Sequence, residues 1–364
     1  MEYEEFIEEQ LNTIDTRPLN DLLKENEHFS ILTDDLTVSN IVNSMLNGQA
    51  ILDSDKIFDE LLYLLLSEIK SSLVLAGEIL TICIVIGLLS NMSNSFGSKT
   101  SSYIGTIICS FIVIALCIGS FHQTYECCTT TLNVMTKAME LLLPILIPLL
   151  ISMGGLSSAS IMNPAMAAAV TGFNFIIQNI VMPLIFLSTI FILINSITEK
   201  DYIKRLSIFI RKAALFITGL CITIFSGITA VQSIVAKSAD GILMNTARFS
   251  ISNFVPIVGG FASDSIEMVI SCIGLIKNAV GIVGIIIIVS LLILPIIKIM
   301  AIALIYKLTS IVAEPVATKN ISDGLNELGS SAVTMTVVLA CGAFMFLIFI
   351  TIIMSMGGGS LWTS

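Results

Sequence analysis

Charge is what this sequence has least of. Only 12% of its 364 residues are charged, 55% are hydrophobic, and the mean hydropathy is +0.97. A soluble domain of this length needs many more charged side chains at its surface. Apolar runs of about 20 residues, enough to span a bilayer, recur along the chain instead. Because these runs are continuous and do not alternate with polar residues, they predict a polytopic, all-α membrane protein and exclude a β-barrel.

Catalytic and metal-binding signatures are missing as well. The chain has two histidines, and its eight cysteines form no CxxC pair and no cluster with histidine, which argues against a zinc site. No Walker A, HExxH, GxSxG or Rossmann sequence is present. No basic patch interleaved with aromatic residues suggests nucleic acid. We therefore expect no enzymatic activity, no cofactor and no nucleic-acid partner, and any active transport would need an ion gradient or a partner ATPase.

The acidic residues gather before residue 70. Residues 1–56 are predicted to form an amphipathic helical segment outside the membrane, because Phe6, Ile7, Leu11 and Ile14 recur at helical spacing. The chain opens without a basic region or an early apolar run. Two alternatives follow: the N-terminus stays in the cytoplasm, or a leader has been removed and the N-terminus is extracytoplasmic.

The remaining chain is predicted to form three membrane units. They are a first helix pair with loops at 57–137, a first repeat at 138–235 and a second repeat at 236–364. In the first unit, apolar runs predict spans at 72–89 and 103–121, and polar residues predict loops at 90–102 and 122–137.

Residues 141–164 are apolar enough to enter a membrane but contain several helix-breaking residues. Pro144 and Pro148 each remove a backbone donor, and Gly154-Gly155 lowers the cost of leaving the helix. Asn163-Pro164 adds a further interruption. Broken backbone in hydrocarbon is tolerated only where it is buried in protein or lines a cavity. The stretch is therefore a kinked spanning helix or a re-entrant hairpin.

Charge topology bears on that choice. The densest basic cluster lies at 198–212 and should be cytoplasmic by the positive-inside rule. If the N-terminus is extracytoplasmic, a re-entrant 141–164 delivers this cluster to the cytoplasm, and a spanning one does not. A cytoplasmic N-terminus reverses the preference.

A second interrupted stretch, 253–271, contains Pro256 and Gly259-Gly260 and echoes the first. Together with similar pairs further along each unit, it indicates a weak parallel internal duplication. Repeated broken helices line the transport path in some transporters. We take the following positions as candidates for the wall of a passage or for helix packing: Pro144, Pro148, Gly154, Gly155, Asn163, Pro164, Pro256, Gly259 and Gly260.

Ionisable residues inside apolar runs are the other candidates, because such groups are expensive in hydrocarbon and tend to face a partner or water. They are Glu78, Glu140, Asp264, Glu267, Lys277 and Lys298. Asp264 and Glu267 share a helical face, and Lys277 could neutralise one of them. Three explanations stay open: snorkelling at the interface, structural pairing, and a role in conduction or coupling.

Several segments carry a resemblance to a known family. They include PILIPLLISMGGLSSASIMNP at 144–164, TARFSISNFVPIVGGFASDS at 246–265 and LIKNAVGIVGIIIIV at 275–289. Over nearly its whole length the chain resembles the stage III sporulation protein AE family of endospore-forming bacteria. Members of this family usually begin with a signal sequence, which this chain lacks.

The resemblance implies a non-enzymatic component of a multiprotein channel or secretion-like complex between mother cell and forespore. It would lie in the mother-cell membrane that surrounds the forespore and support forespore development. Its implied partners are other proteins of the same operon, including a secretion-type ATPase and ring-forming components, and indirectly the stage II sporulation protein Q. Two alternatives remain: a self-sufficient secondary transporter for a small solute, and a structural scaffold, since kinked helices also pack into homo-oligomers.

Overall fold

The computed structural model describes residues 54–96, 99–197, 202–254 and 259–356. Within these residues every element is a helix and there is no strand, which confirms the all-α prediction. Six helical segments are long and apolar enough to cross a membrane, so the predicted polytopic membrane protein is also confirmed. They are Leu61–Leu89, Ile104–Ser152, Ala168–Asn195, Lys204–Ile242, Met268–Ala313 and Lys319–Ser355.

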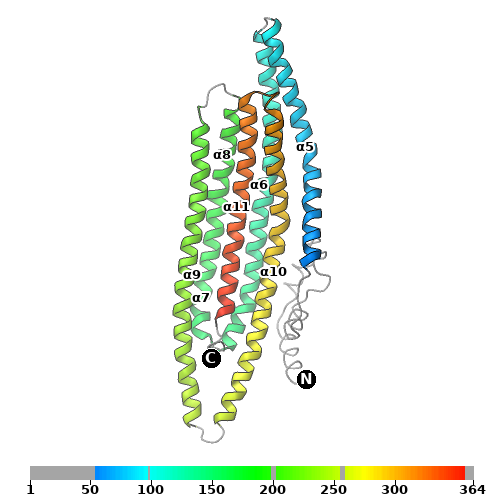
Figure 1. Cartoon of the computed structure of the whole chain (residues 1–364). Helices are drawn as coiled ribbons and strands as arrows, with labels where there is room; N and C mark the ends of the chain where they lie inside the picture. Colours follow the sequence, from blue (N-terminus) through cyan, green and yellow to red (C-terminus); the bar gives the residue numbers. More distant parts are fainter. Residues whose placement is uncertain (1–53, 97–98, 198–201, 255–258, 357–364) are drawn as a thin grey trace.

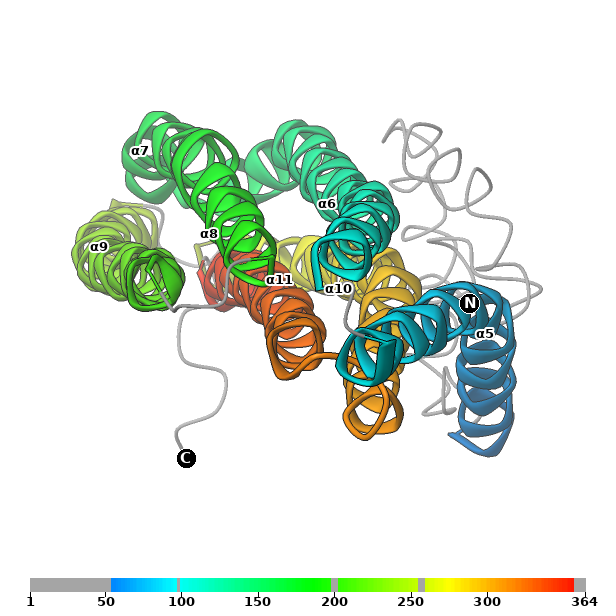
Figure 2. The ribbon, with the colours of Figure 1, turned by 90° about the horizontal axis from the view of Figure 1, so that it is seen from above.

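The helices run alternately up and down an elongated bundle (Figure 1). In chain order they are α5 (Ser54–Phe96), α6 (Lys99–Ser152), α7 (Leu156–Ile176), the π-helical turn η1 (Ile177–Val181), α8 (Met182–Asn195), α9 (Lys204–Phe254), α10 (Gly259–Ala313) and α11 (Lys319–Ser355). The segments α7, η1 and α8 follow one another without a turn and rise as one crossing. Seen from above, α6 lies at the perimeter between α8 and α10 (Figure 2).

Helix α6 is one continuous helix of 54 residues, about 80 Å long at 1.5 Å per residue. The predicted loop at 122–137 is therefore wrong. Cys128, Leu132 and Met135 recur at helical spacing and are fully or almost fully buried, with Leu132 beside Gly342 of α11. Most of the polar residues that suggested a loop lie on the opposite, exposed face of the same helix, and its buried threonines donate to backbone carbonyls four residues earlier.

The predicted loop at 90–102 is too long for the same kind of reason. Helix α5 continues to Phe96 and α6 begins at Lys99, so only residues 97–98 separate the two helices. The first crossing also starts earlier than predicted, at Leu61 and not at 72. Short polar residues in this region extend the two helices above the other hairpins (Figure 1).

The α8–α9 and α10–α11 hairpins share one side-chain arrangement near the top of the bundle. Between α8 and α9, Ser188 and Ser207 each donate to the other's backbone carbonyl, at 2.8 and 2.7 Å. Between α10 and α11, Ser310 and Ser322 do the same, at 2.8 and 2.9 Å. This likeness fits a duplication of two hairpins, although the duplication and the proposed unit boundaries stay predictions. Most of the predicted N-terminal segment, 1–56, lies outside the described residues.

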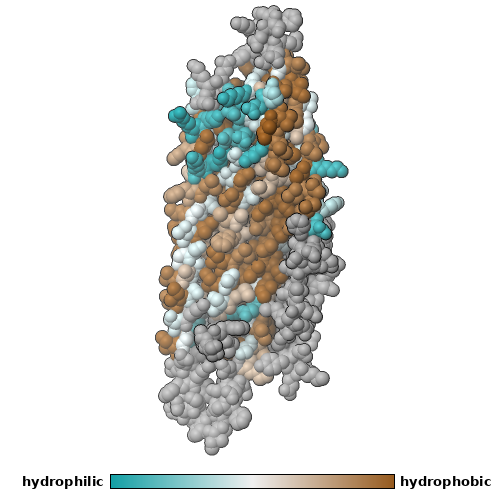
Figure 3. All heavy atoms as spheres, in the orientation of Figure 1, coloured by the Kyte–Doolittle hydropathy of each residue, from teal (hydrophilic) through white to brown (hydrophobic). Residues whose placement is uncertain are grey.

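Hydrophilic and hydrophobic residues separate along the bundle axis (Figure 3). Hydrophilic atoms gather at the upper end of the visible face, where α9 and α11 begin, and a broad hydrophobic band lies below them. Residues 213–236 of α9 and 328–356 of α11 contain no charged side chain. Each of these two helices thus has an uncharged stretch long enough to cross a bilayer.

A glycine on α5 sets the position of this helix. A methyl group at Gly87 would overlap the carbonyl oxygen of Val316 in the α10–α11 turn, whereas Gly77 on the same helix faces open space. We expect Gly87→Ala to destabilise the fold by about 1–3 kcal/mol, the usual cost of overpacking. Gly77→Ala should instead stabilise it by about 0.5–1 kcal/mol, because alanine is the better helix former. Thermal unfolding of both variants in detergent measures the difference, and equal shifts would contradict this packing.

Candidate functional site

The interrupted stretch 141–164 forms the junction between two long helices at the lower end of the bundle. Pro144 and Pro148 lie inside α6 and do not end it. The chain turns at Gly154, whose φ of 85° lies in the left-handed region that favours glycine. Gly155 N–H donates to the carbonyl of Leu150 at 3.0 Å, and a side chain there would lie 2.8 Å from that oxygen. Both positions therefore favour glycine, Gly154 for its backbone conformation and Gly155 for its close approach to Leu150.

This geometry settles the form of the turn. The chain does turn back at 141–164, as a re-entrant stretch would, but it does so at the end of the long α6 crossing and not in a separate short hairpin. Asn163 and Pro164 belong to α7, and their side chains lie outside the described residues. Gly259 and Gly260 open α10, whereas Pro256 lies outside the described residues.

Asp240 of α9 accepts hydrogen bonds from the first residues of α7 at this junction. Its Oδ1 accepts the Ser157 N–H at 2.9 Å, its Oδ2 accepts the Ser158 N–H at 3.2 Å, and Oδ2 also accepts the Ser158 hydroxyl. Asp240 is 9% exposed and Ser158 is fully buried. The first N–H groups of a helix have no partner within the helix and carry a partial positive charge. The buried carboxylate of Asp240 at the start of α7 accepts hydrogen bonds from these N–H groups and balances their partial positive charge.

Lys277 has the complementary role at the same end of the bundle. This side chain is 1% exposed, and its Nζ donates to the carbonyl of Met356, where α11 ends. A cation there neutralises the partial negative charge of a helix C-terminus. Lys277 therefore caps a helix end from within the bundle, where the sequence left interfacial snorkelling open.

The other predicted charges are not brought together by the fold. Glu78 of α5, Glu140 of α6 and Lys298 of α10 are each exposed. The side chains of Asp264 and Glu267 lie outside the described residues, so their pairing with Lys277 stays a prediction. Among the residues that the structure describes, no three His, Cys, Asp or Glu side chains are close enough together to hold a metal ion.

Two ion pairs that sequence reasoning missed join α9 to α11 at the upper end. Arg211 Nη2 donates to Glu327 Oε2 at 2.6 Å, and Lys204 Nζ donates to Asp323 Oδ2 at 2.8 Å. The Arg211–Glu327 pair is 15% and 19% exposed, so it is shielded more than the Lys204–Asp323 pair. The basic cluster suggested only an orientation, because no sequence spacing reveals a partner more than a hundred residues away.

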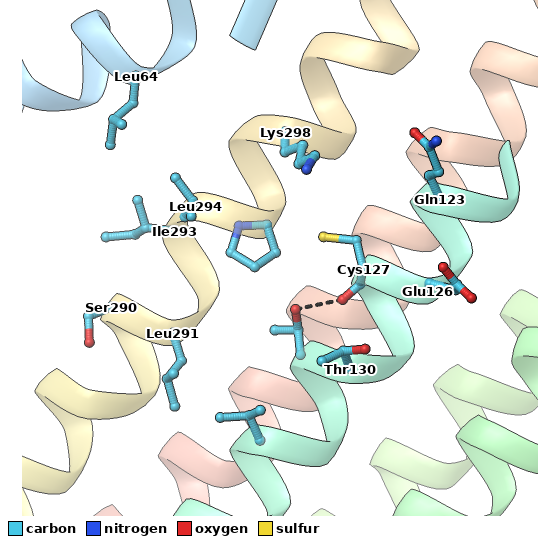
Figure 4. Close-up of a pocket in the computed structure, with 13 residues that line it drawn as sticks. Leu64, Gln123, Glu126, Cys127, Thr130, Ser290, Leu291, Ile293, Leu294 and Lys298 are labelled. Carbon is cyan, nitrogen blue, oxygen red and sulfur yellow. Dashed lines mark hydrogen bonds between the residues drawn. The ribbon is translucent and has the colours of Figure 1, made fainter. Parts of the chain in front are cut away.

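A cavity of about 470 Å³ opens between α6 and α10, beneath the start of α5. Figure 4 shows the Cys127 thiol and Lys298 on its two sides, while Glu126 is directed away from α10. Pro295, inside α10, lines the same cavity. The sequence marked Lys298 as unusual but did not place it opposite α6.

Comparison with known proteins gives consistent results. The family model described as stage III sporulation protein AE matches residues 36–357. The stage III sporulation protein AE of Bacillus subtilis (strain 168) is 31% identical over 312 residues, which cover 86% of this chain and 78% of that protein. No solved structure matches.

The cap at the α6–α7 junction can be tested by substitution. Asp240→Ala should lower the free energy of unfolding by at least about 1 kcal/mol, because α7 loses its cap and buried N–H groups lose their acceptor. Ser238→Ala on the same helix is the control, since the Ser238 hydroxyl is exposed and donates only to the Ile234 carbonyl within α9. Thermal unfolding in detergent would contradict the cap if both variants matched the parent chain.

Lys277 should contribute more to the stability of the protein than Lys298. Lys277→Met removes the donor at the end of α11 and should destabilise the protein by about 1–2 kcal/mol, the range for a partly buried charge at a helix terminus. Lys298→Met replaces an exposed side chain and should change stability by less than about 0.5 kcal/mol. The midpoints of thermal unfolding of the two variants, measured side by side, test this: a drop for Lys298→Met as large as for Lys277→Met would contradict it.

Proposed function

Because the chain belongs to the stage III sporulation protein AE family, we propose that it is a non-enzymatic membrane component of a multiprotein channel or secretion-like complex between mother cell and forespore. The observation that carries this proposal is the family match, which extends over the membrane-crossing helices and not over one short motif. The description of the family names a sporulation protein and no enzyme class.

The contacts within the bundle support a membrane component whose charges serve its architecture. Asp240 and Lys277 cap helix ends, and Arg211 joins α9 to α11. None of these groups needs a substrate to complete its set of partners. These three charges thus contribute to the assembly of the helices, which fits a component whose energy source is a separate ATPase.

The proposed orientation follows from the ends of the helices. The basic first turns of α9 lie at the upper end, together with the α5–α6 and α10–α11 turns (Figure 1). By the positive-inside rule this end faces the mother-cell cytoplasm, where a secretion-type ATPase would be accessible. The lower end, with the α6–α7 turn and the end of α11, then faces the space between the two membranes. Ring-forming partners, and through them the stage II sporulation protein Q, would meet the chain there.

Deletion of the gene in its endospore-forming host tests the proposal. We expect the deletion strain to lose late forespore gene expression and heat-resistant spores, and expression of this chain should restore both. Affinity purification of the tagged chain from sporulating cells should recover the operon's ATPase and ring-forming components. Normal sporulation of the deletion strain would overturn the proposal. Solute flux through liposomes that contain this chain alone would favour a self-sufficient transporter instead.

A further inference from the structure

One face of α6 is polar at the level where the neighbouring helices are uncharged. Glu126, Thr130, Asn133, Lys137 and Glu140 follow one another at steps of three and four residues, and all five are exposed. We call these five residues the α6 stripe. At 1.5 Å per residue the stripe is about 21 Å long, most of the thickness of a hydrocarbon core.

The depth of the stripe follows from contacts across the bundle. Leu142 of α6 lies beside Gly284 of α10, and Cys127 lies across the cavity from Lys298. Because α6 and α10 are antiparallel, Lys137 is level with the middle of residues 278–297, which carry no charged side chain. Lys137 therefore lies near the centre of the apolar zone and too deep for the interface.

Neither lipid nor the described part of this chain supplies ion-pair partners for two charged residues of the α6 stripe. In the part of the chain that the structure describes, Lys137 and Glu140 have no ion-pair partner, although both are exposed. Ionised lysine or aspartate near the centre of a lipid-facing helix costs roughly 2.5–3.5 kcal/mol per residue on insertion scales. The exposed face of α9 shows the contrast, because Ile224, Ile228 and Val231 suit lipid.

Further polar groups extend the α6 stripe on both sides. Gln178 of η1 donates to Asn133 at 2.6 Å and to Asn174 at 2.9 Å, so two more amides join the same face. Below the stripe, Pro144 and Pro148 are exposed and lack N–H groups, which leaves the carbonyls of Glu140 and Pro144 without their helical donors. Free carbonyls at membrane depth are tolerated where water or protein reaches them.

The face of α6 that packs into the bundle is mainly apolar at this level. Leu132, Met135, Met139 and Leu142, on the inner face of α6, are all buried in the hydrophobic core. The charged groups of α6 thus lie on its outer face and large apolar side chains on its inner face, the reverse of a pore enclosed by one chain.

We propose that the α6 stripe lines a water-filled passage formed between copies of this chain, with the stripes of several copies facing one another around a common axis. In a parallel ring each stripe residue meets its own copies at one level, so the passage carries rings of Glu126, Asn133, Lys137 and Glu140. Rings of charged side chains are one way in which pores select hydrophilic solutes. The assignment of this passage to the sporulation channel rests on the function proposed above, whereas the passage itself rests on the stripe.

Water access and contact between copies can be measured separately. Asn133→Cys and Lys137→Cys, in host membranes, are treated with a membrane-impermeant thiol reagent, and Ile228→Cys on the lipid-facing side of α9 is the control. Only the ionised thiol reacts, so a cysteine in water should label at least about tenfold faster than one in lipid. Mild oxidation of Asn133→Cys should also give disulfide-linked dimers, and Ile228→Cys should not. The parent chain, with its eight cysteines, supplies the background.

The outcomes decide the proposal without reference to sporulation. Fast labelling together with cross-linking supports it. Labelling as slow as at Ile228→Cys would overturn it, because the stripe would then face lipid. Labelling without cross-linking would also overturn it, because the water would then lie within one chain. Cross-linking of sites that do not label would overturn it as well, because the interface between copies would then be dry.

A leucine substitution connects the α6 stripe to function. Lys137→Leu should accumulate in the membrane at or above the parent level, because it removes a charge from the apolar zone, yet it should fail to restore heat-resistant spores in the deletion strain. Ile228→Leu should restore them. Full restoration of heat-resistant spores by Lys137→Leu would overturn the proposed passage. A deletion strain without a sporulation defect would overturn only the proposed function and leave the labelling result standing.

Discussion

A helix that ends at the edge of a membrane leaves four N–H or four C=O groups without partners, and this bundle depends on how those groups are satisfied. At the lower end α9 supplies Asp240 to the start of α7, and α10 supplies Lys277 to the end of α11. Each charge has the sign that the helix dipole favours. Because each cap comes from a different crossing, the caps also fix how the helices align.

The same constraint explains why α6 and α9 differ. Both lie at the perimeter of the bundle, but α9 exposes aliphatic and aromatic side chains whereas α6 exposes amides, a lysine and carboxylates at the same depth. The described helices supply no ion-pair partner for Lys137 or Glu140 on the exposed face of α6. The helices pack well against one another, but the exposed face of α6 does not suit lipid. The proposed passage between copies of this chain follows from that mismatch.

The errors of sequence reading came from one source. Polar residues at 122–137 and 90–102 predicted loops, and prolines at 144 and 148 predicted breaks, yet all of the described residues among them are helical. A window of residues reports average polarity, but a helix needs only one apolar face to stay packed. Gly154 differs from the prolines, because its positive φ is a local requirement of the backbone that favours glycine.

By itself the sequence determined the all-α membrane class, the family and the basic cluster that begins α9, whereas it left the form of the 141–164 stretch open. These depend on composition, on local backbone chemistry and on residues that are near one another in the chain. Only the tertiary structure decided that Lys277 caps α11, that Asp240 caps α7, that Arg211 meets Glu327, and that the charges of α6 face outward. Such pairings depend on which helices become neighbours, and that is set by packing over the whole bundle.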